Sequence, residues 1–306
     1  MDYTTLWWRG IERLVSGGTG AQVVCSSYCA PLKNPHNEIL ISQGEPTHDL
    51  CKIGWVIGTS VIPHVIVRGC IKFGSMFVVN RKVINGNVIE LIVFDFDGTL
   101  MDSTTAIAES IQSAAADVGV PVPSTERASH VIGLGLQDAL RYAIPDLPQE
   151  RYQELGERYR HHYLARDHKL RLFTGVEAML DELSSEGYLL TIATGKRRTG
   201  LDRALGATGL GSRFQSSRCA DECNSKPHPQ MLQELMEELG VSPEGTLMIG
   251  DTTHDLQMAR NAGVHAVAVT YGAHPRDVLE AECPVYCANN VAELTNWLSS
   301  NRRQAI

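Results

Sequence analysis

The chain has 306 residues, 43% of them hydrophobic, which is enough for about two globular domains with sizeable cores. Its formal net charge is −8 at pH 7 and is unevenly distributed. Residues 1–88 carry eight Lys and Arg against five Asp and Glu, or +3, and residues 89–306 carry −11. This acidic part repels phosphate backbones, so we expect no nucleic acid partner.

The eight cysteines bear on the compartment of the protein. No basic stretch followed by an apolar run is visible near the N-terminus, so we expect reduced thiols in a cytoplasmic protein. The pairs Cys25/Cys29, Cys219/Cys223 and Cys283/Cys287 share a spacing that is not typical of zinc sites, and we interpret it as coincidence. The apolar run at 55–67 is too short to span a bilayer, so we expect no membrane partner.

Residues 1–88 show neither a clear hydrophobic period nor a repeat. We expect this atypical segment to be disordered or to be an over-extended reading of the gene start, with the true product beginning near Met76. The alternative is an accessory domain with a small core formed by Trp7, Trp8 and the run at 55–67.

From residue 89 onward, short apolar runs alternate with amphipathic segments. The runs at 90–95, 188–194, 246–251, 265–270 and 285–288 are typical of buried strands. Residues 176–187 and 229–240 place apolar side chains at helical spacing, and Gly187 ends the first of these helices as a C-cap would. This alternation predicts an α/β fold with a doubly wound parallel sheet and helices on both faces.

Residues 104–172 break the alternation, because they contain helix-like stretches and no convincing strand. We therefore expect a helical cap domain at 104–172, inserted after the first strand. The core would then consist of residues 89–103 and 173–306.

Polar residues follow several of the predicted strands. Ligands of parallel sheets bind at the carboxyl ends of the strands, so these residues are expected to share one pocket. They are Asp95, Asp97, Thr194, Gly195, Asp251 and Asp255, and Lys226 lies in a loop before a further helix.

Four stretches containing these residues, "DFDGTLMDS", "IATGK", "SKPHPQML" and "GDTTHDLQMARNAG", resemble the four ordered motifs of the haloacid dehalogenase superfamily. The resemblance is to its phosphoglycolate phosphatase-like branch with a helical cap, and it covers about residues 89–300. It implies a magnesium-dependent phosphatase that works on a small phosphorylated metabolite through an aspartyl-phosphate.

The resemblance also implies a role for each matching residue. Asp95 is the nucleophile and Asp97 the general acid/base. Thr194, Gly195 and Lys226 contact the substrate phosphate, with Thr194 and Lys226 also counted as catalytic. The Mg²⁺ ligands are Asp95, Asp97, Asp251 and Asp255.

Electrostatics agrees with these roles. At 4 Å and an effective dielectric constant near 20, a carboxylate and a phosphate dianion repel by about 8 kcal/mol, so cations are required. Mg²⁺ accepts one or two carboxylates together with phosphate oxygens, and Lys226 offsets the remaining negative charge. Asp97 lies two residues beyond Asp95, so along an extended strand both side chains point to the same face.

Simpler interpretations apply to several residues. Asp102 and Ser103 fit helix capping, and the alternative for Asp255 is that it only caps or braces its helix instead of binding metal. Lys196 could contact phosphate or be solvated. The stretch "GLGLQD" at 133–138 lacks the third glycine and the preceding strand of a dinucleotide-binding motif.

Other functions remain as alternatives. A β-phosphoglucomutase-type mutase shares the core, but its cap loop usually carries an Arg that "GLGLQDAL" lacks. A dehalogenase would not need Asp97, and a catalytically dead scaffold would be expected to have lost a motif. The sequence leaves open whether the substrate is phosphoglycolate, a sugar phosphate or a nucleoside monophosphate, how cap residues such as Arg127 and His130 contribute, and whether the protein is a monomer or a homodimer.

Overall fold

The structure is a computed structural model. It describes the backbone of residues 11–17, 20–25, 52–53, 56–57, 60–61, 65–66, 80–300 and 302–304, and the side chains of residues 81–300. The chain divides into two units, Met1–Met76 and Phe77–Ile306. None of the described helices is long and apolar enough to cross a membrane.

The described part of the first unit consists of short antiparallel strand pairs. β1 (Ile11–Gly17) pairs with β2 (Gly20–Cys25), β3 (Lys52–Ile53) with β6 (Val65–Ile66), and β4 (Val56–Ile57) with β5 (Ser60–Val61). The proposed start near Met76 and the small core around Trp7 and Trp8 lie outside the described residues.

The second unit is built on a six-stranded sheet in the order β13-β12-β9-β14-β15-β16, in which every neighbouring pair is parallel. The strands are β9 (Leu91–Phe94), β12 (Leu189–Thr194), β13 (Ser216–Cys219), β14 (Thr246–Gly250), β15 (His265–Val269) and β16 (Tyr286–Ala288). The predicted doubly wound α/β fold is confirmed.

Helices cover both faces of this sheet. They are α5 (Val176–Ser185), α6 (Arg198–Thr208), α7 (Gln230–Leu239), α8 (Thr253–Ala262), α9 (Arg276–Glu280) and α10 (Val291–Ser299), with short 3₁₀ turns at η2 (Gly211–Arg213) and η3 (Pro243–Gly245). Successive side chains of a strand point to opposite faces. Ile92 and Phe94 accordingly pack in one core with α5 and α10, whereas Leu91 and Val93 pack in a second core with α7 and α8. Burial on both faces explains why the central strands read as unbroken apolar runs.

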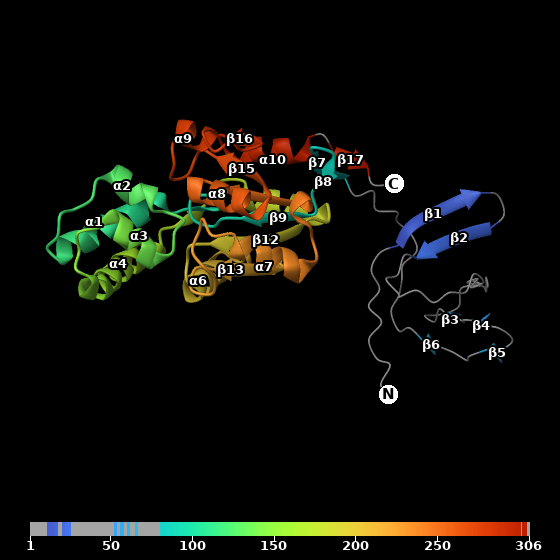
Figure 1. Cartoon of the computed structure of the whole chain (residues 1–306), viewed down its shortest axis with the longest axis horizontal. Coiled ribbons are helices and arrows are strands. Elements are labelled where there is room, and N and C mark those ends of the chain that lie inside the picture. The colour runs from blue at the N-terminus through green and yellow to red at the C-terminus, as the bar shows by residue number, and fades with distance from the viewer. Residues whose placement is uncertain are drawn as a thin grey trace. The chain divides into compact units, whose positions relative to one another are not determined.

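The residues between β9 and α5 form a separate group of helices (Figure 1). They are α1 (Thr104–Asp117), α2 (Thr125–His130), α3 (Leu136–Ala143), η1 (Gln149–Arg151) and α4 (Tyr152–Asp167). These helices bury their own core, which includes Ile111, Leu140 and Leu155. An antiparallel ribbon of β10 (Met101–Asp102) and β11 (Arg171–Leu172) joins them to the sheet. The helical cap inserted after the first strand of the sheet is thus present.

A hairpin precedes the first strand of the sheet. β7 (Asn80–Ile84) and β8 (Asn87–Val88) are joined by Asn85 and Gly86, both with positive φ, as a two-residue hairpin turn of type I′ requires. β7 also pairs with β17 (Arg302–Gln304), and the Lys82 ammonium donates to the Trp297 carbonyl at 2.7 Å. The described residues 80–88, which the sequence analysis grouped with the N-terminal segment, therefore lie in the second unit.

Candidate active site

Three carboxylates meet at the carboxyl ends of β9 and β14. Asp95 follows β9, Asp251 follows β14, and Asp255 lies in the first turn of α8; all three are fully buried. An oxygen of each lies within 4.8 Å of an oxygen of the other two. The structure thus brings together residues that are up to 160 positions apart, as expected for parallel strands that end at one edge of a sheet.

Lys226 reaches this cluster from the loop between β13 and α7. Its ammonium lies 2.7 Å from Asp95 Oδ1 and 2.6 Å from Asp255 Oδ1, and the three side chains are essentially inaccessible to solvent. Burial disfavours the charged lysine, but Asp255 and Asp95 together raise its pKa above the usual value. Lys226 is therefore a buried cation shared between two carboxylates.

The carboxylates are destabilised by their surroundings. Burial raises the pKa of Asp95 to about 7, even though Lys226 acts in the opposite direction. Burial, followed by the charges of Asp95 and Asp255, raises the pKa of Asp251 well above its usual value. One ammonium does not compensate three carboxylates, so the cluster favours a further cation.

The donor set fits a magnesium ion. Asp95 Oδ2 is buried and has no hydrogen-bond partner, and Oδ1 keeps a lone pair that Lys226 does not use, so this carboxylate has room for both a metal ion and a substrate phosphate. Asp251 is oriented by the Thr99 hydroxyl at 2.9 Å and by the Ala273 N–H at 2.7 Å, and its carboxylate oxygens keep free lone pairs. Carboxylate oxygens are the ligands that Mg²⁺ prefers.

Asp255 has a second task besides its place in the cluster. Its Oδ2 accepts hydrogen bonds from the Thr252 N–H and hydroxyl, and Thr252 caps α8 in return, so the two form a capping box. Both carboxylate oxygens of Asp255 therefore have partners, because Oδ1 binds Lys226. Of the three aspartates, Asp95 and Asp251 are the better placed to hold a metal ion.

Glycines leave room for Asp251. Gly98 adopts φ +81°, and a Cβ at this position would lie 2.1 Å from Asp251 Oδ2. A Cβ on Gly272 would lie 2.3 Å from Asp251 Cβ. Only glycine combines the left-handed backbone at 98 with this close approach.

Asp97 lies in a separate polar group beside the cluster. The Ser103 hydroxyl donates to Asp97 Oδ1 at 2.6 Å, and the Lys196 ammonium lies 2.9 Å from Asp97 Oδ2. Ser103 stands at the N-cap position of α1 but makes no side-chain cap hydrogen bond, so its expected capping role is wrong. Asp97 does not belong to the three-carboxylate cluster, and its role as a metal ligand stays a prediction.

Lys196 connects the cap to the core. Its ammonium donates to the Tyr163 hydroxyl of α4 at 2.8 Å, and its side chain is only 10% exposed, so it is not a solvated lysine. The local sequence around Lys196 does not indicate Tyr163, because Tyr163 lies 33 positions earlier in a helix rich in charged residues. Lys196 and Tyr163 are therefore functional candidates. The sequence left the role of Lys196 open and did not indicate Tyr163.

Thr194 and Gly195 lie at the end of β12. Thr194 is fully buried, and its hydroxyl oxygen accepts from the Lys196 N–H at 3.2 Å, which leaves the hydroxyl hydrogen available to a ligand. A Cβ on Gly195 would lie 2.5 Å from the carbonyl oxygens of Gly133 and Leu134. Residues 133–135 of the "GLGLQD" stretch are therefore a cap loop that lies directly against Gly195, and residues 136–138 begin α3.

A cavity of about 360 Å³ lies between cap and core. Asp95, Asp97, Thr194, Gly195 and Lys196 line one side of it. Side chains of α1, α3 and α4 and of the cap loop line the other side. A ligand in this cavity would thus touch the reactive aspartates and the cap at once.

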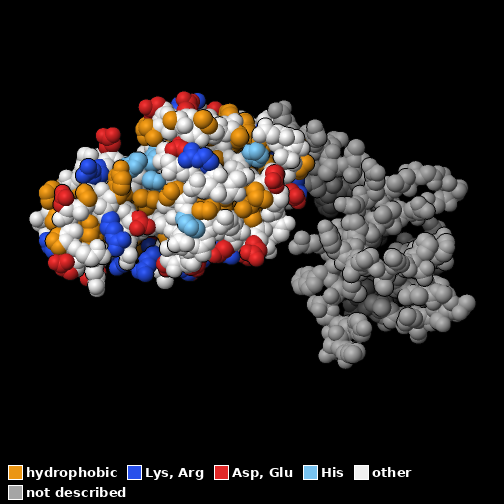
Figure 2. All heavy atoms as spheres, viewed as in Figure 1, with side chains coloured by type: hydrophobic (Ala, Val, Ile, Leu, Met, Phe, Trp, Pro, Cys, Tyr) orange, Lys and Arg blue, Asp and Glu red, His pale blue; other side chains and the backbone are white. Residues whose placement is uncertain are grey.

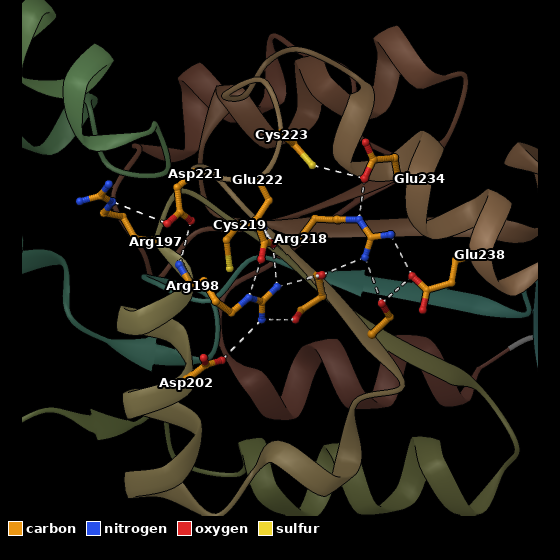
Figure 3. A network of polar contacts seen from close by, with 12 residues as sticks. Arg197, Arg198, Asp202, Arg218, Cys219, Asp221, Glu222, Cys223, Glu234 and Glu238 are labelled. Atoms are coloured by element: carbon orange, nitrogen blue, oxygen red, sulfur yellow. Dashed lines mark hydrogen bonds and ion pairs between the residues drawn. The ribbon is translucent and has the colours of Figure 1, made fainter.

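A network of ion pairs holds the segment that leads to Lys226 (Figure 3). Arg198 binds Glu222 through two hydrogen bonds of 2.7 Å each. Arg218 binds Glu234 of α7 at 2.7 Å and Glu238 at 2.9 Å. Paired contacts of a guanidinium with a carboxylate fix orientation as well as distance. The network therefore ties β13 to α6 and α7 and positions the loop of Lys226 between them.

The cysteines are not part of a metal site in the described residues. Cys219, Cys223, Cys283 and Cys287 are free, and the aspartate cluster is the one metal-type grouping found where side chains are described. On the face of the second unit seen in Figure 2, acidic and basic side chains are interspersed.

Comparison with known proteins is consistent with this geometry. A family model described as haloacid dehalogenase-like hydrolase matches residues 92–269. The chain is 34% identical over 210 residues to a probable phosphatase IndB from Dickeya dadantii, covering 67% of this chain and 91% of that protein. It is also 34% identical over 223 residues to a phosphoglycolate phosphatase from Aliivibrio fischeri, covering 70% and 98%.

A solved structure shares the fold. The crystal structure of a protein described as a predicted phosphoglycolate phosphatase from Haemophilus somnus superposes with a TM-score of 0.61 at 28% identity, covering 68% of this chain and 97% of that one. The chain belongs to the haloacid dehalogenase-like hydrolases, and it is a phosphatase of their phosphoglycolate phosphatase-like branch.

Proposed function

We propose that the protein is a magnesium-dependent phosphatase that hydrolyses a small phosphorylated metabolite through an aspartyl-phosphate on Asp95. The observation that carries this proposal is the buried Asp95 Oδ2, which has no hydrogen-bond partner although Oδ1 is held by Lys226. An oriented carboxylate with one free oxygen is the group that nucleophilic attack on phosphorus requires.

The first half-reaction transfers the phosphoryl group to the enzyme. Asp95 Oδ2 forms a bond to phosphorus while the bond to the ester oxygen breaks, and Asp97 donates a proton to the departing alkoxide. Thr194 donates its hydroxyl hydrogen to a phosphate oxygen, and the Lys226 ammonium offsets negative charge beside Asp95. Ser103 and Lys196 hold both oxygens of Asp97 in a fixed orientation for this transfer.

The second half-reaction releases phosphate. Water attacks phosphorus, Asp97 accepts its proton, and the bond to Asp95 breaks, so that the enzyme returns to its starting state. Mg²⁺ held by Asp95 and Asp251 would neutralise charge on the transferring phosphoryl group. Asp255 orients Lys226 and braces α8 in this account.

The cap restricts access to the reacting groups. Its loop lies against Gly195, and Tyr163 is bound to Lys196, so the cap covers the cavity while a substrate is bound. The proposed substrates are small phosphate monoesters, including phosphoglycolate, sugar phosphates and nucleoside monophosphates. We place the enzyme in the cytoplasm, where thiols such as the four free cysteines of the described part stay reduced.

The test is phosphate release from p-nitrophenyl phosphate by the purified full chain. We expect turnover with Mg²⁺, none in EDTA, and recovery when Mg²⁺ is added back. Asp95→Asn should abolish turnover while preserving the circular dichroism spectrum, because the amide is nearly isosteric but cannot form the acyl phosphate. Substantial Mg²⁺-dependent turnover by Asp95→Asn would reject the covalent mechanism, and undiminished turnover in EDTA would remove the metal.

A further inference from the structure

We propose that the cavity selects phosphate monoesters whose alcohol carries an uncharged, largely apolar body of ring size, in preference to two-carbon acids such as glycolate. This inference rests on the proposed function and names the substrate class of the same site. It follows from the chemistry of the cap wall.

Apart from Arg160, the cap side of the cavity is lined mainly by aliphatic and aromatic side chains. The wall is formed by α1, α3, α4 and the segment that follows α2, and it includes Ile107, Ile111, Val131, Leu136, Tyr159 and Tyr163. The volume of about 360 Å³ falls within the range of about 300 to 1,000 Å³ typical of small-molecule sites. A two-carbon acid would fill only a small part of this space and would leave water against apolar walls, which is unfavourable.

The cavity also lacks a buried cation that is free to bind a carboxylate. Among the described lining residues, Lys196 is held by Asp97 and Tyr163, and Arg203 binds Asp167 at 2.6 Å. Arg197 lies 3.7 Å from Asp221. Arg160 has no ion pair within the described part of the chain, but it is exposed, so water competes for its guanidinium. None of the described lining cations is therefore both buried and unpaired, so an acidic leaving group would meet only solvated or ion-paired cations.

Tyr159 lines the cavity with an apolar ring face and one hydroxyl group. Its ring is stacked on that of Tyr163 with centroids 5.9 Å apart and planes inclined by 22°. Its hydroxyl makes no hydrogen bond to another described residue, and burial raises its pKa above the usual value, so the hydroxyl stays protonated. A flat apolar surface with one free hydroxyl matches a ring that carries a single polar group.

The experiment compares benzyl phosphate with 2-phosphoglycolate. Both are esters of primary alcohols, so the comparison reports mainly on recognition of the leaving group. With the purified full chain and Mg²⁺, we expect kcat/KM to be at least about tenfold higher for benzyl phosphate. Leu136→Asn, a change at a half-buried cap position, should lower kcat/KM for benzyl phosphate about tenfold and change that for 2-phosphoglycolate less than about threefold.

One variant serves as the matched control. Val122→Asn makes the same type of change in the cap at a position that is 53% exposed and does not line the cavity, so both substrates should be unaffected. Arg160→Gln tests the exposed lining cation: because water competes for its guanidinium, the change should lower kcat/KM for 2-phosphoglycolate by less than about threefold and keep the wild-type preference for benzyl phosphate. The wild-type ratio of the two esters tests the inference even where Leu136→Asn fails to fold.

Three results would overturn the inference. A wild-type preference for 2-phosphoglycolate that Arg160→Gln abolishes would show that the cavity binds an acid through Arg160. Equal loss of both activities in a folded Leu136→Asn variant would show that the apolar wall does not discriminate. If neither these esters nor p-nitrophenyl phosphate is hydrolysed, the proposed function itself fails, which is a different result from a reversed preference.

Discussion

Replacing Lys226 with Met should destabilise the protein and inactivate it. Methionine keeps much of the buried stem but removes the ammonium that lies 2.7 Å from Asp95 and 2.6 Å from Asp255. Asp95 and Asp255 would then be buried carboxylates without their cation. Deleting one partner of a buried ion pair lowers the free energy of unfolding by about 3–5 kcal/mol. We expect a loss of this size at neutral pH.

The loss of unfolding free energy expected for Lys226→Met has an upper limit. Because the pKa of Asp95 is already raised to about 7, protonation of this carboxyl relieves part of the repulsion, so losses from the two contacts do not simply add. The effect on catalysis is not relieved in this way, since a proton on Asp95 blocks its attack on phosphorus. We therefore expect kcat/KM to fall by at least about 10³-fold.

The assay is urea-induced unfolding of the full chain followed by circular dichroism, combined with p-nitrophenyl phosphate turnover. Lys169→Met is the matched control, because Lys169 is exposed and the change should alter stability by no more than about 0.5 kcal/mol. A Lys226→Met variant as stable as this control would refute the reasoning, because the buried pair would then contribute nothing. Retained turnover would refute the role of Lys226 in phosphate binding.

Three further changes probe other parts of the structure. Gly98→Ala should lower kcat/KM and Mg²⁺ affinity at least about tenfold relative to Gly119→Ala, as measured by turnover and metal titration. Both glycines have positive φ, but only a Cβ at position 98 meets Asp251, so equal effects of the two changes would contradict this. Burial raises the pKa of the Cys219 thiol to about 12, so iodoacetamide at pH 8 should modify exposed Cys283 and spare Cys219 in peptide mass spectra, and equal labelling would be the contrary result. Removing residues 1–75 should leave kcat nearly unchanged, since every candidate site residue lies in the second unit; loss of soluble, active enzyme would favour an accessory domain.

Strands could be predicted from the sequence wherever both of their faces are buried. Strands such as β9 and β14 are apolar on both faces, so the sequence marks them clearly. The sixth strand, β13, was missed because it lies at the sheet edge and reads Ser-Ser-Arg-Cys, with three of four residues only partly buried. Its arginine packs into an ion-pair network instead of a core, and no periodicity reveals such a partner.

The gathering of the aspartates and Lys226 could be predicted because each lies just after a strand, just before a helix or in the first turn of a helix of a parallel α/β sheet. The partners of Asp97 could not. Ser103 stands where a helix cap is expected, and only the folded chain brings its hydroxyl within 2.6 Å of Asp97. Lys196 meets Tyr163 across the boundary between cap and core, a contact that depends on how two separately packed groups of helices dock. Local sequence carries no information about that docking.

The central claim is that Asp95 becomes phosphorylated during turnover. Mixing the enzyme with p-nitrophenyl phosphate and Mg²⁺, quenching in acid within one turnover, and reducing with borohydride converts an aspartyl-phosphate to homoserine, which peptide mass spectrometry locates. The account predicts homoserine at position 95 in the wild-type protein and none in Asp95→Asn. Turnover with unmodified Asp95 in every quenched sample, or a phosphoryl group on another side chain, would contradict it.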